Sequence, residues 1–222
     1  MAATKTKKEK EIKDFDILTA YMEYVLEHDK EPVSVYRFCK DVKIDEKQFY
    51  MHFGSFDALK KRVWTTFFEN TIQLLEKDSG FMSSSGRDKM LAFFFTFFEL
   101  LTLNRSYVLF TLKSHQRIPD NLNQLKPLRQ HFKDFTKDIS ESENEEKTLK
   151  ILKKPTRLFS EGAWLHFMFL LKFWMDDDSP GFEKTDVAIE KSVNTVFDVL
   201  DNTPLDSVLD FGKFIWKEKF VS

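Results

Sequence analysis

The chain has 222 residues, of which 42% are hydrophobic and 32% charged, and its formal net charge at pH 7 is −2. This is the composition of a globular protein, and it excludes a chain that is strongly basic throughout. A single cysteine, Cys39, excludes an intrachain disulfide and any cysteine-based metal site. Six glycines and six prolines against 25 phenylalanines favour long helices over a turn-rich β architecture, so we expect an all-α fold.

The N-terminal part of the chain predicts three short helices. Residues 1–9 are rich in lysine and are interpreted as a flexible basic arm, and apolar residues then recur at helical spacing over 10–28. Ser34 and Asp45 each precede a short helix, and their side chains can accept hydrogen bonds from the unpaired N–H groups of its first turn. Two such helices with an apolar inner edge and a tight turn form a helix-turn-helix, whose second helix can enter a DNA major groove.

A set of residues around this motif follows a known family pattern. The set combines a capping serine, an apolar pair, a Tyr-x-x-Phe pair and a leucine that opens the next helix: Ser34, Phe38, Cys39, Ile44, Tyr50, Phe53, Ser55 and Leu59. In this respect the chain resembles the N-terminal domain of the TetR family of bacterial transcriptional regulators. It departs from the family pattern at Lys43, where a turn glycine is usual, and at Phe56, where a lysine is usual. The resemblance implies a helix-turn-helix DNA-binding domain over 10–57 and a helical ligand-binding and dimerisation domain over 58–222.

The remainder of the chain predicts helices and loops only. Helices are expected over 56–77, 87–103, 106–116, 122–139, 158–175, 186–200 and from 203 to about 220, with loops at 78–86 and 140–146. The acidic run 176–178, followed by Ser-Pro-Gly, ends the helix before it. The longest apolar run, 90–103, is too short to span a bilayer, and no apolar run follows the N-terminal lysines, so we expect a cytoplasmic protein.

The helices expected over 87–103 and 158–175 are apolar almost all round, which is typical of central helices. Their aromatic surface permits two interpretations, an apolar ligand cavity and plain core packing. For a cavity, the candidate ligand-binding residues are aromatic side chains and a few embedded polar ones: Phe94, Phe98, Glu99, Phe110, His166, Phe167 and Lys172. The family resemblance also implies a homodimer through a four-helix bundle built from 158–175 and 186–200 of both subunits.

The candidate DNA-binding residues lie on or near the second helix of the motif and are Ser34, Arg37, Lys47, Gln48, Tyr50, His52 and Lys60. Gln48 can pair with adenine, and Lys47 with guanine or phosphate. By the resemblance, Tyr50 and His52 match positions that contact phosphate. Asp45 and Glu46 place negative charge close to the expected path of the phosphates, and residues 1–62 hold 13 Lys or Arg against 12 Asp or Glu. Loss of DNA binding with retention of the fold is therefore the competing interpretation.

We find no catalytic constellation, phosphate-binding glycine loop or metal-ligand cluster in the sequence, so we expect neither an enzyme nor a cofactor. Two functions remain. The first is a TetR-like repressor that leaves operator DNA when a small apolar or lipid-like effector binds. The second is a lipid-binding protein of the same fold that has lost DNA binding, as in the lipid-binding protein of ubiquinone biosynthesis. The aromatic and basic segment 206–220 fits either a helix on a membrane surface or one packed on its own domain.

Overall fold

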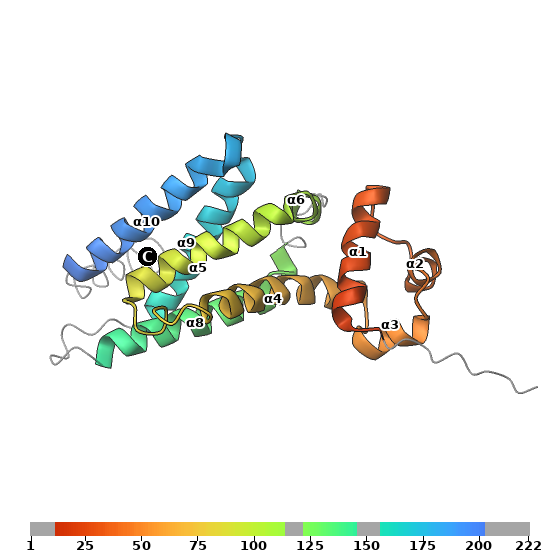
Figure 1. The fold of residues 1–222 in the computed structure, drawn as a ribbon, viewed down its shortest axis with the longest axis horizontal. Helices are drawn as coiled ribbons and strands as arrows, with labels where there is room; N and C mark the ends of the chain where they lie inside the picture. The colour runs from red at the N-terminus through yellow and green to blue at the C-terminus, as the bar shows by residue number, and fades with distance from the viewer. Residues whose placement is uncertain (1–11, 114–121, 146–155, 203–222) are drawn as a thin grey trace, which may run out of the picture. The chain divides into compact units, whose positions relative to one another are not determined.

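The computed structural model describes residues 12–113, 122–145 and 156–202. All regular structure in these ranges is helical, as the sequence predicts (Figure 1). The chain divides into two compact units, one drawn from Met1–Trp64 and Asn104–Lys126, the other from Thr65–Leu103 and Pro127–Ser222. The predicted basic arm and the predicted helix from 203 to about 220 lie outside the described residues.

The first unit contains α1 (Asp14–His28), α2 (Val35–Val42), α3 (Glu46–His52), the first half of α4 (Phe56–Leu75) and α6 (Arg105–Lys113). Its helices enclose an aromatic core. Phe38 has no exposed surface, and its ring packs edge-on against Tyr21, Tyr24 and Phe49 with centroids 5.6–6.1 Å apart. Such edge-to-face pairs add directional attraction to the burial of apolar area. The core therefore fixes α1, α2 and α3 as one helix-turn-helix unit.

Local hydrogen bonds define the ends of α2 and α3. The Ser34 hydroxyl accepts a hydrogen bond from the Arg37 N–H at 3.2 Å, and the Asp45 carboxylate accepts one from the Lys47 N–H at 2.7 Å. Both predicted caps are thus confirmed. Lys43 ends α2 in the left-handed conformation (φ 58°, ψ 40°). This conformation costs a residue with a Cβ atom about 1–2 kcal/mol, which explains why glycine is usual at this position in the family that the chain resembles.

The second unit contains the second half of α4, α5 (Gly86–Leu103), most of α8 (Lys126–Glu145), α9 (Thr156–Asp176), a 3-10 turn η2 (Pro180–Phe182) and α10 (Glu183–Asn202). Its core is also aromatic. The fully or almost fully buried rings come from α5, α8 and α9 and are Phe93, Phe94, Phe97, Phe98, Phe132, Phe167 and Trp174. Helix α5 packs along α10, and α9 packs against α10 as well. The prediction of a central helix is correct for α5, whereas α9 is buried on one side and leaves Leu165 and Phe169 exposed on the other.

The predicted loop over 140–146 is wrong, because α8 continues to Glu145. Ser140, despite its polar side chain, is fully buried. The start of α5 passes close by, since a methyl group at Gly86 would lie 2.7 Å from a methyl carbon of Ile139. The glycine permits this close approach, and the buried side chains of Ile139 and Ser140 hold this part of α8 in the core, although Glu141, Ser142 and Glu145 beyond it are exposed.

The acidic run after α9 has a structural role. Asp177 accepts hydrogen bonds from the backbone N–H and hydroxyl of Ser179 and from those of Thr185, at 2.6–2.9 Å. Burial alone would raise the pKa of Asp177, but these four bonds outweigh it and hold the pKa at about 2. Asp178 pairs with Lys184. Within the described residues there is neither a cluster of side chains suited to a metal ion nor a helix able to cross a membrane.

Candidate nucleic-acid interface and ligand pocket

Helix α3 presents a mixed polar and apolar face to solvent. Lys47 is exposed, Tyr50 is 52% exposed and Met51 is 71% exposed, whereas Gln48 is half-buried. Phe49, on the opposite side of the helix, has no exposed surface. The short helix therefore has the arrangement that a recognition helix needs. Phe49 packs into the core, and side chains with hydrogen-bond donors, Lys47 and Tyr50, face solvent.

Two exposed side chains among the predicted DNA contacts, Arg37 and His52, already have partners within the protein. The Arg37 guanidinium lies 3.2 Å from the Asp41 carboxylate. A His52 ring nitrogen lies 2.9 Å from the carbonyl oxygen of Ile12, at the start of α1. These side chains remain exposed, and each already has a partner that a phosphate would replace or share.

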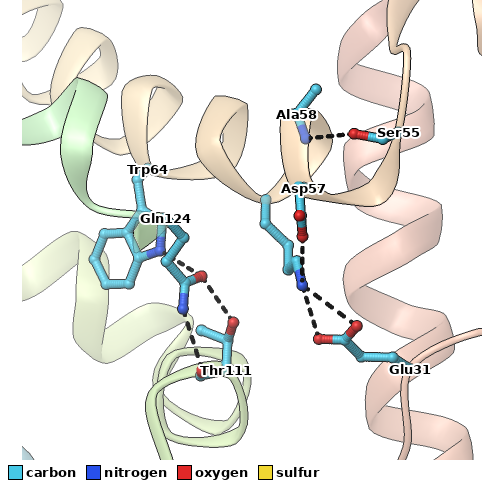
Figure 2. A network of polar contacts seen from close by, with 8 residues as sticks. Glu31, Ser55, Asp57, Ala58, Trp64, Thr111 and Gln124 are labelled. Atoms are coloured by element: carbon cyan, nitrogen blue, oxygen red, sulfur yellow. Dashed lines mark hydrogen bonds and ion pairs between the residues drawn. The ribbon is translucent and has the colours of Figure 1, made fainter. Parts of the chain in front are cut away.

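Lys60 differs most from its predicted role. Its side chain is only 13% exposed, and its amino group lies 3.1 Å from Glu31 and 3.2 Å from Asp57. Both carboxylates converge on it (Figure 2). Lys60 therefore joins α4 to the segment after α1, and its charge is compensated, so it does not offer the free cation that the sequence suggested.

Phe56 has a structural explanation for its departure from the family pattern. Its ring stacks on Tyr21 with centroids 5.5 Å apart and meets Phe38 and Phe49 at 5.6 and 5.5 Å. The side chain closes the aromatic core of the helix-turn-helix, whereas a lysine at this position would reach for solvent. At this position the chain therefore has a packed aromatic ring where the family usually has a charged lysine.

The first unit contains a buried polar network that the sequence did not predict. The Trp64 indole N–H donates to the Gln124 side-chain oxygen at 3.0 Å, and the Thr111 hydroxyl donates to the same oxygen at 2.8 Å. The Gln124 amide donates to the Thr111 carbonyl at 3.2 Å, which completes the network in Figure 2. The network ties α4 to α6, but its partners lie up to 60 residues apart and no local pattern reveals them.

The second unit has an apolar pocket of about 380 Å³ between α5, α9 and α10. Its walls are mostly aliphatic and aromatic, including Met90 of α5, Leu158 and Leu165 of α9, and Val196 and Leu200 of α10. Two side chains that carry polar groups, Glu161 and His166, complete the lining. A volume of this size lies within the range of small-molecule sites in proteins.

His166 is the one predicted ligand residue that lines this pocket. Its Nε2 atom lies 2.7 Å from the Ser192 hydroxyl, and its ring meets Phe94 edge-on at 5.2 Å. Burial lowers the pKa of His166 to about 4, so the imidazole is neutral at physiological pH. A neutral imidazole has one donor and one acceptor nitrogen, and Ser192 occupies only Nε2.

The family model for the tetracycline repressor-like C-terminal domain matches residues 89–215, which is more than half of the chain. The chain belongs to the TetR family. No curated protein matches it. The TetR-like region begins within α5 and extends past the end of α10, so it includes every helix that contributes to the apolar pocket.

The other predicted ligand residues of this TetR-family protein lie elsewhere. Phe94, Phe98 and Phe167 are buried in the core of the second unit. Glu99 lines a smaller pocket of about 210 Å³ beside Asp186, whose pKa burial and neighbouring carboxylates raise. Lys172 pairs with Asp176 on the surface of α9, and Phe110 lies on α6 in the first unit. The structure does not bring these residues together with His166 at one pocket.

The TetR-like second unit also has an exposed apolar face on α9 and α10. Leu165 is 70% exposed, Phe169 54% and Val199 51%. Large apolar side chains at this exposure on two adjacent helices are unusual for a surface that stays in water. The residues missed by prediction are therefore mainly aliphatic positions of α9 and α10, and their i, i+3 and i, i+4 spacing was the available signal.

Proposed function

We propose that this TetR-family protein is a homodimeric transcriptional repressor that binds operator DNA through α2 and α3 and is released by a small apolar effector. The observation that carries the proposal is the capped α2–turn–α3 motif, which exposes Lys47 and Tyr50 on the second helix. The TetR-like C-terminal domain of the same chain supports it.

The exposed side chains of α3 have the chemistry for DNA contact. The Lys47 ammonium pairs with a phosphate or with the acceptor atoms of guanine, and the Tyr50 hydroxyl donates to a phosphate oxygen. Ser34 and the first N–H groups of α2 form a second phosphate contact, because a helix N-terminus attracts anions. Each phosphate contact made by a cation releases counterions, so we expect binding to weaken steeply as salt rises.

The exposed apolar face on α9 and α10 supports a homodimer. Members of the TetR family generally act as dimers. Burying exposed apolar side chains outside the pocket lining, such as Phe169 and Val187, against a second copy removes apolar surface from water, which stabilises the dimer. Two copies then place two α3 helices on one face of DNA, at half-sites about one helical turn (~34 Å) apart.

Capture of genomic DNA from the source organism by the purified chain tests the proposal. Fragments retained at about 50 mM salt and lost at about 200 mM salt are expected to share a palindromic site. A matched variant, Lys47→Ala with Tyr50→Ala, removes two exposed contacts that the core does not need and should abolish enrichment. Failure of the folded wild-type chain to enrich any site at low salt would overturn the proposal.

A lipid-binding protein without DNA binding is the second candidate, and specific contacts favour it. The charges of Arg37 and Lys60 are compensated by carboxylates, and Phe56 fills the core where the family has a lysine. These contacts reduce the positive charge available to DNA. For this candidate the expected results are no DNA enrichment at any salt concentration and binding of an apolar ligand by the second unit.

A further inference from the structure

The apolar pocket between α5, α9 and α10 has two side chains with polar groups in its lining, Glu161 and His166. The Glu161 carboxylate lies 2.7 Å from Arg129 and 2.6 Å from Lys133, both on α8. These pairs lower the pKa of Glu161 and compensate its charge. Arg87 lies 5.7 Å from the ring of Phe197 in the pocket wall, but Asp198 pairs with it at 2.6 Å. The charge of Glu161 is therefore compensated, and the cations that pair with it, like Arg87, are not among the residues that line the pocket.

The remaining polar feature is the pair of His166 and Ser192. The Ser192 hydroxyl donates to the Ile189 carbonyl at 3.4 Å, so the His166 Nε2–H is best assigned as donor to the Ser192 oxygen at 2.7 Å. The other ring nitrogen, Nδ1, is then an acceptor. A hydroxyl group satisfies His166 in either tautomer, because a hydroxyl both donates and accepts.

Gly162 enlarges the pocket. It stands inside α9, and a Cβ atom added to it would have no neighbour within 4 Å outside its own helix backbone. Its φ angle is not in the left-handed region, so the backbone does not require glycine there. A glycine inside a helix is less favourable than alanine, and this one leaves a notch in the pocket wall.

We propose that this pocket binds an uncharged amphiphile, an aliphatic chain with one hydroxyl group, whose chain lies over Gly162 and whose hydroxyl pairs with His166. The inference rests on the proposed function for its regulatory meaning, since it specifies the effector of that function. The volume of about 380 Å³ has room for about a dozen water-sized groups, which suits a medium-length chain. An apolar side chain from a second copy would fill the pocket but would leave Nδ1 of His166 without a hydrogen-bond partner.

Calorimetric titration of the full chain with three probes of equal chain length tests this chemistry. The probes are 1-octanol, octanoate and octylammonium at pH 7.4. We expect 1-octanol to bind at least about tenfold more tightly than either ion, because each ion loses hydration without gaining a free counter-charge. Equal or tighter binding of octanoate or octylammonium would overturn the proposal, as would the absence of 1-octanol binding.

Two variants and one control locate the site. Gly162→Leu fills the notch and should abolish 1-octanol binding, with Gly162→Ala giving an intermediate loss that remains informative if the larger variant does not fold. His166→Phe keeps a ring but removes the hydrogen bond, and we expect about fivefold weaker binding. Gln130→Leu adds the same leucine to an exposed position on α8 and should leave binding unchanged.

The outcomes separate a ligand from a second copy of the chain. If Gly162→Leu dissociates a dimer, seen by light scattering, while 1-octanol affinity stays unchanged, a partner helix covers the notch and the proposal fails. The test is also independent of the DNA experiment. Absence of captured DNA overturns the repressor and leaves the 1-octanol result intact, whereas loss of selective 1-octanol binding overturns the pocket proposal whatever DNA does.

Discussion

The helix-turn-helix of the first unit and the pocket of the second unit differ in how the chain builds them. Near neighbours in sequence set the N-terminal ends of α2 and α3, because each capping side chain accepts a hydrogen bond from a backbone N–H group two or three residues further along. The pocket depends on the packing of α5 with α9 and α10, which come much later in the chain. In the first region Arg37, Lys60 and Arg62 are paired with carboxylates, and in the second several large apolar side chains are exposed. A protein of this family can thus keep the packed helix-turn-helix, while its unpaired basic side chains and its exposed apolar side chains determine what it binds.

The largest expected effect breaks the core that holds the first region. Phe38→Ala removes a fully buried ring that contacts four aromatic neighbours, and we expect the free energy of unfolding to fall by about 3–5 kcal/mol. Urea unfolding followed by circular dichroism measures it. Phe15→Ala, in which a ring 59% exposed is removed from α1, is the control and should change little. Equal effects of the two variants would contradict the aromatic core.

The second prediction tests the electrostatics of the pocket through pH. Because burial lowers the His166 pKa from 6.5 to about 4, the unfolded chain takes up a proton between these values and the folded chain does not. This site's contribution to stability is therefore fully present above pH 6.5 and is lost as pH falls towards 4, by about 2–3 kcal/mol. His166→Gln removes the titration, so its stability should fall less over this range. Parallel pH profiles for the two proteins would show that the imidazole is not held neutral.

A smaller effect tests the local determination of the first region. Ser34→Ala deletes the cap of α2 and should cost about 1 kcal/mol, because the Arg37 N–H loses its acceptor. Ser142→Ala, at an exposed position of α8, is the matched control and should cost almost nothing. Chemical denaturation of both variants gives the comparison. A loss at Ser142 as large as that at Ser34 would remove the special role of the cap.

The smallest expected effect concerns the turn at Lys43. Lys43→Gly should raise the free energy of unfolding by about 0.5–1 kcal/mol, since glycine adopts the left-handed conformation without a Cβ clash but loses more chain entropy on folding. Lys43→Ala removes the charge and keeps the Cβ atom, so it should not stabilise. If alanine stabilises as much as glycine, the charge of Lys43 rather than its backbone conformation is responsible.

The contrast between local caps and long-range packing also explains which features the sequence could predict. Caps and apolar periodicity are local, so the all-α fold and most helix ranges followed from residues such as Ser34 and Asp45. The helical end of α8 did not, because its stability depends on the approach of Gly86 to Ile139 from a distant part of the chain. The engagement of Lys60 by Glu31 and the role of Phe56 in the core also depend on tertiary contacts. Of the predicted ligand residues only His166 reaches the apolar pocket, because composition marks apolar helices without saying which side chains remain uncovered.

The most direct test of the central claim, that the exposed face of α3 binds DNA, is the salt dependence of binding to a captured site or to a mixed-sequence duplex. Fluorescence anisotropy gives the slope of log K against log salt concentration. For the wild-type chain we expect a clear negative slope, and for Lys47→Ala a slope smaller in magnitude by about 1, because one phosphate contact is lost. Lys77→Ala, which removes an exposed lysine of the second unit, should leave the slope unchanged. Salt-independent or absent binding by the folded wild-type chain, or an unchanged slope for Lys47→Ala, would contradict the claim.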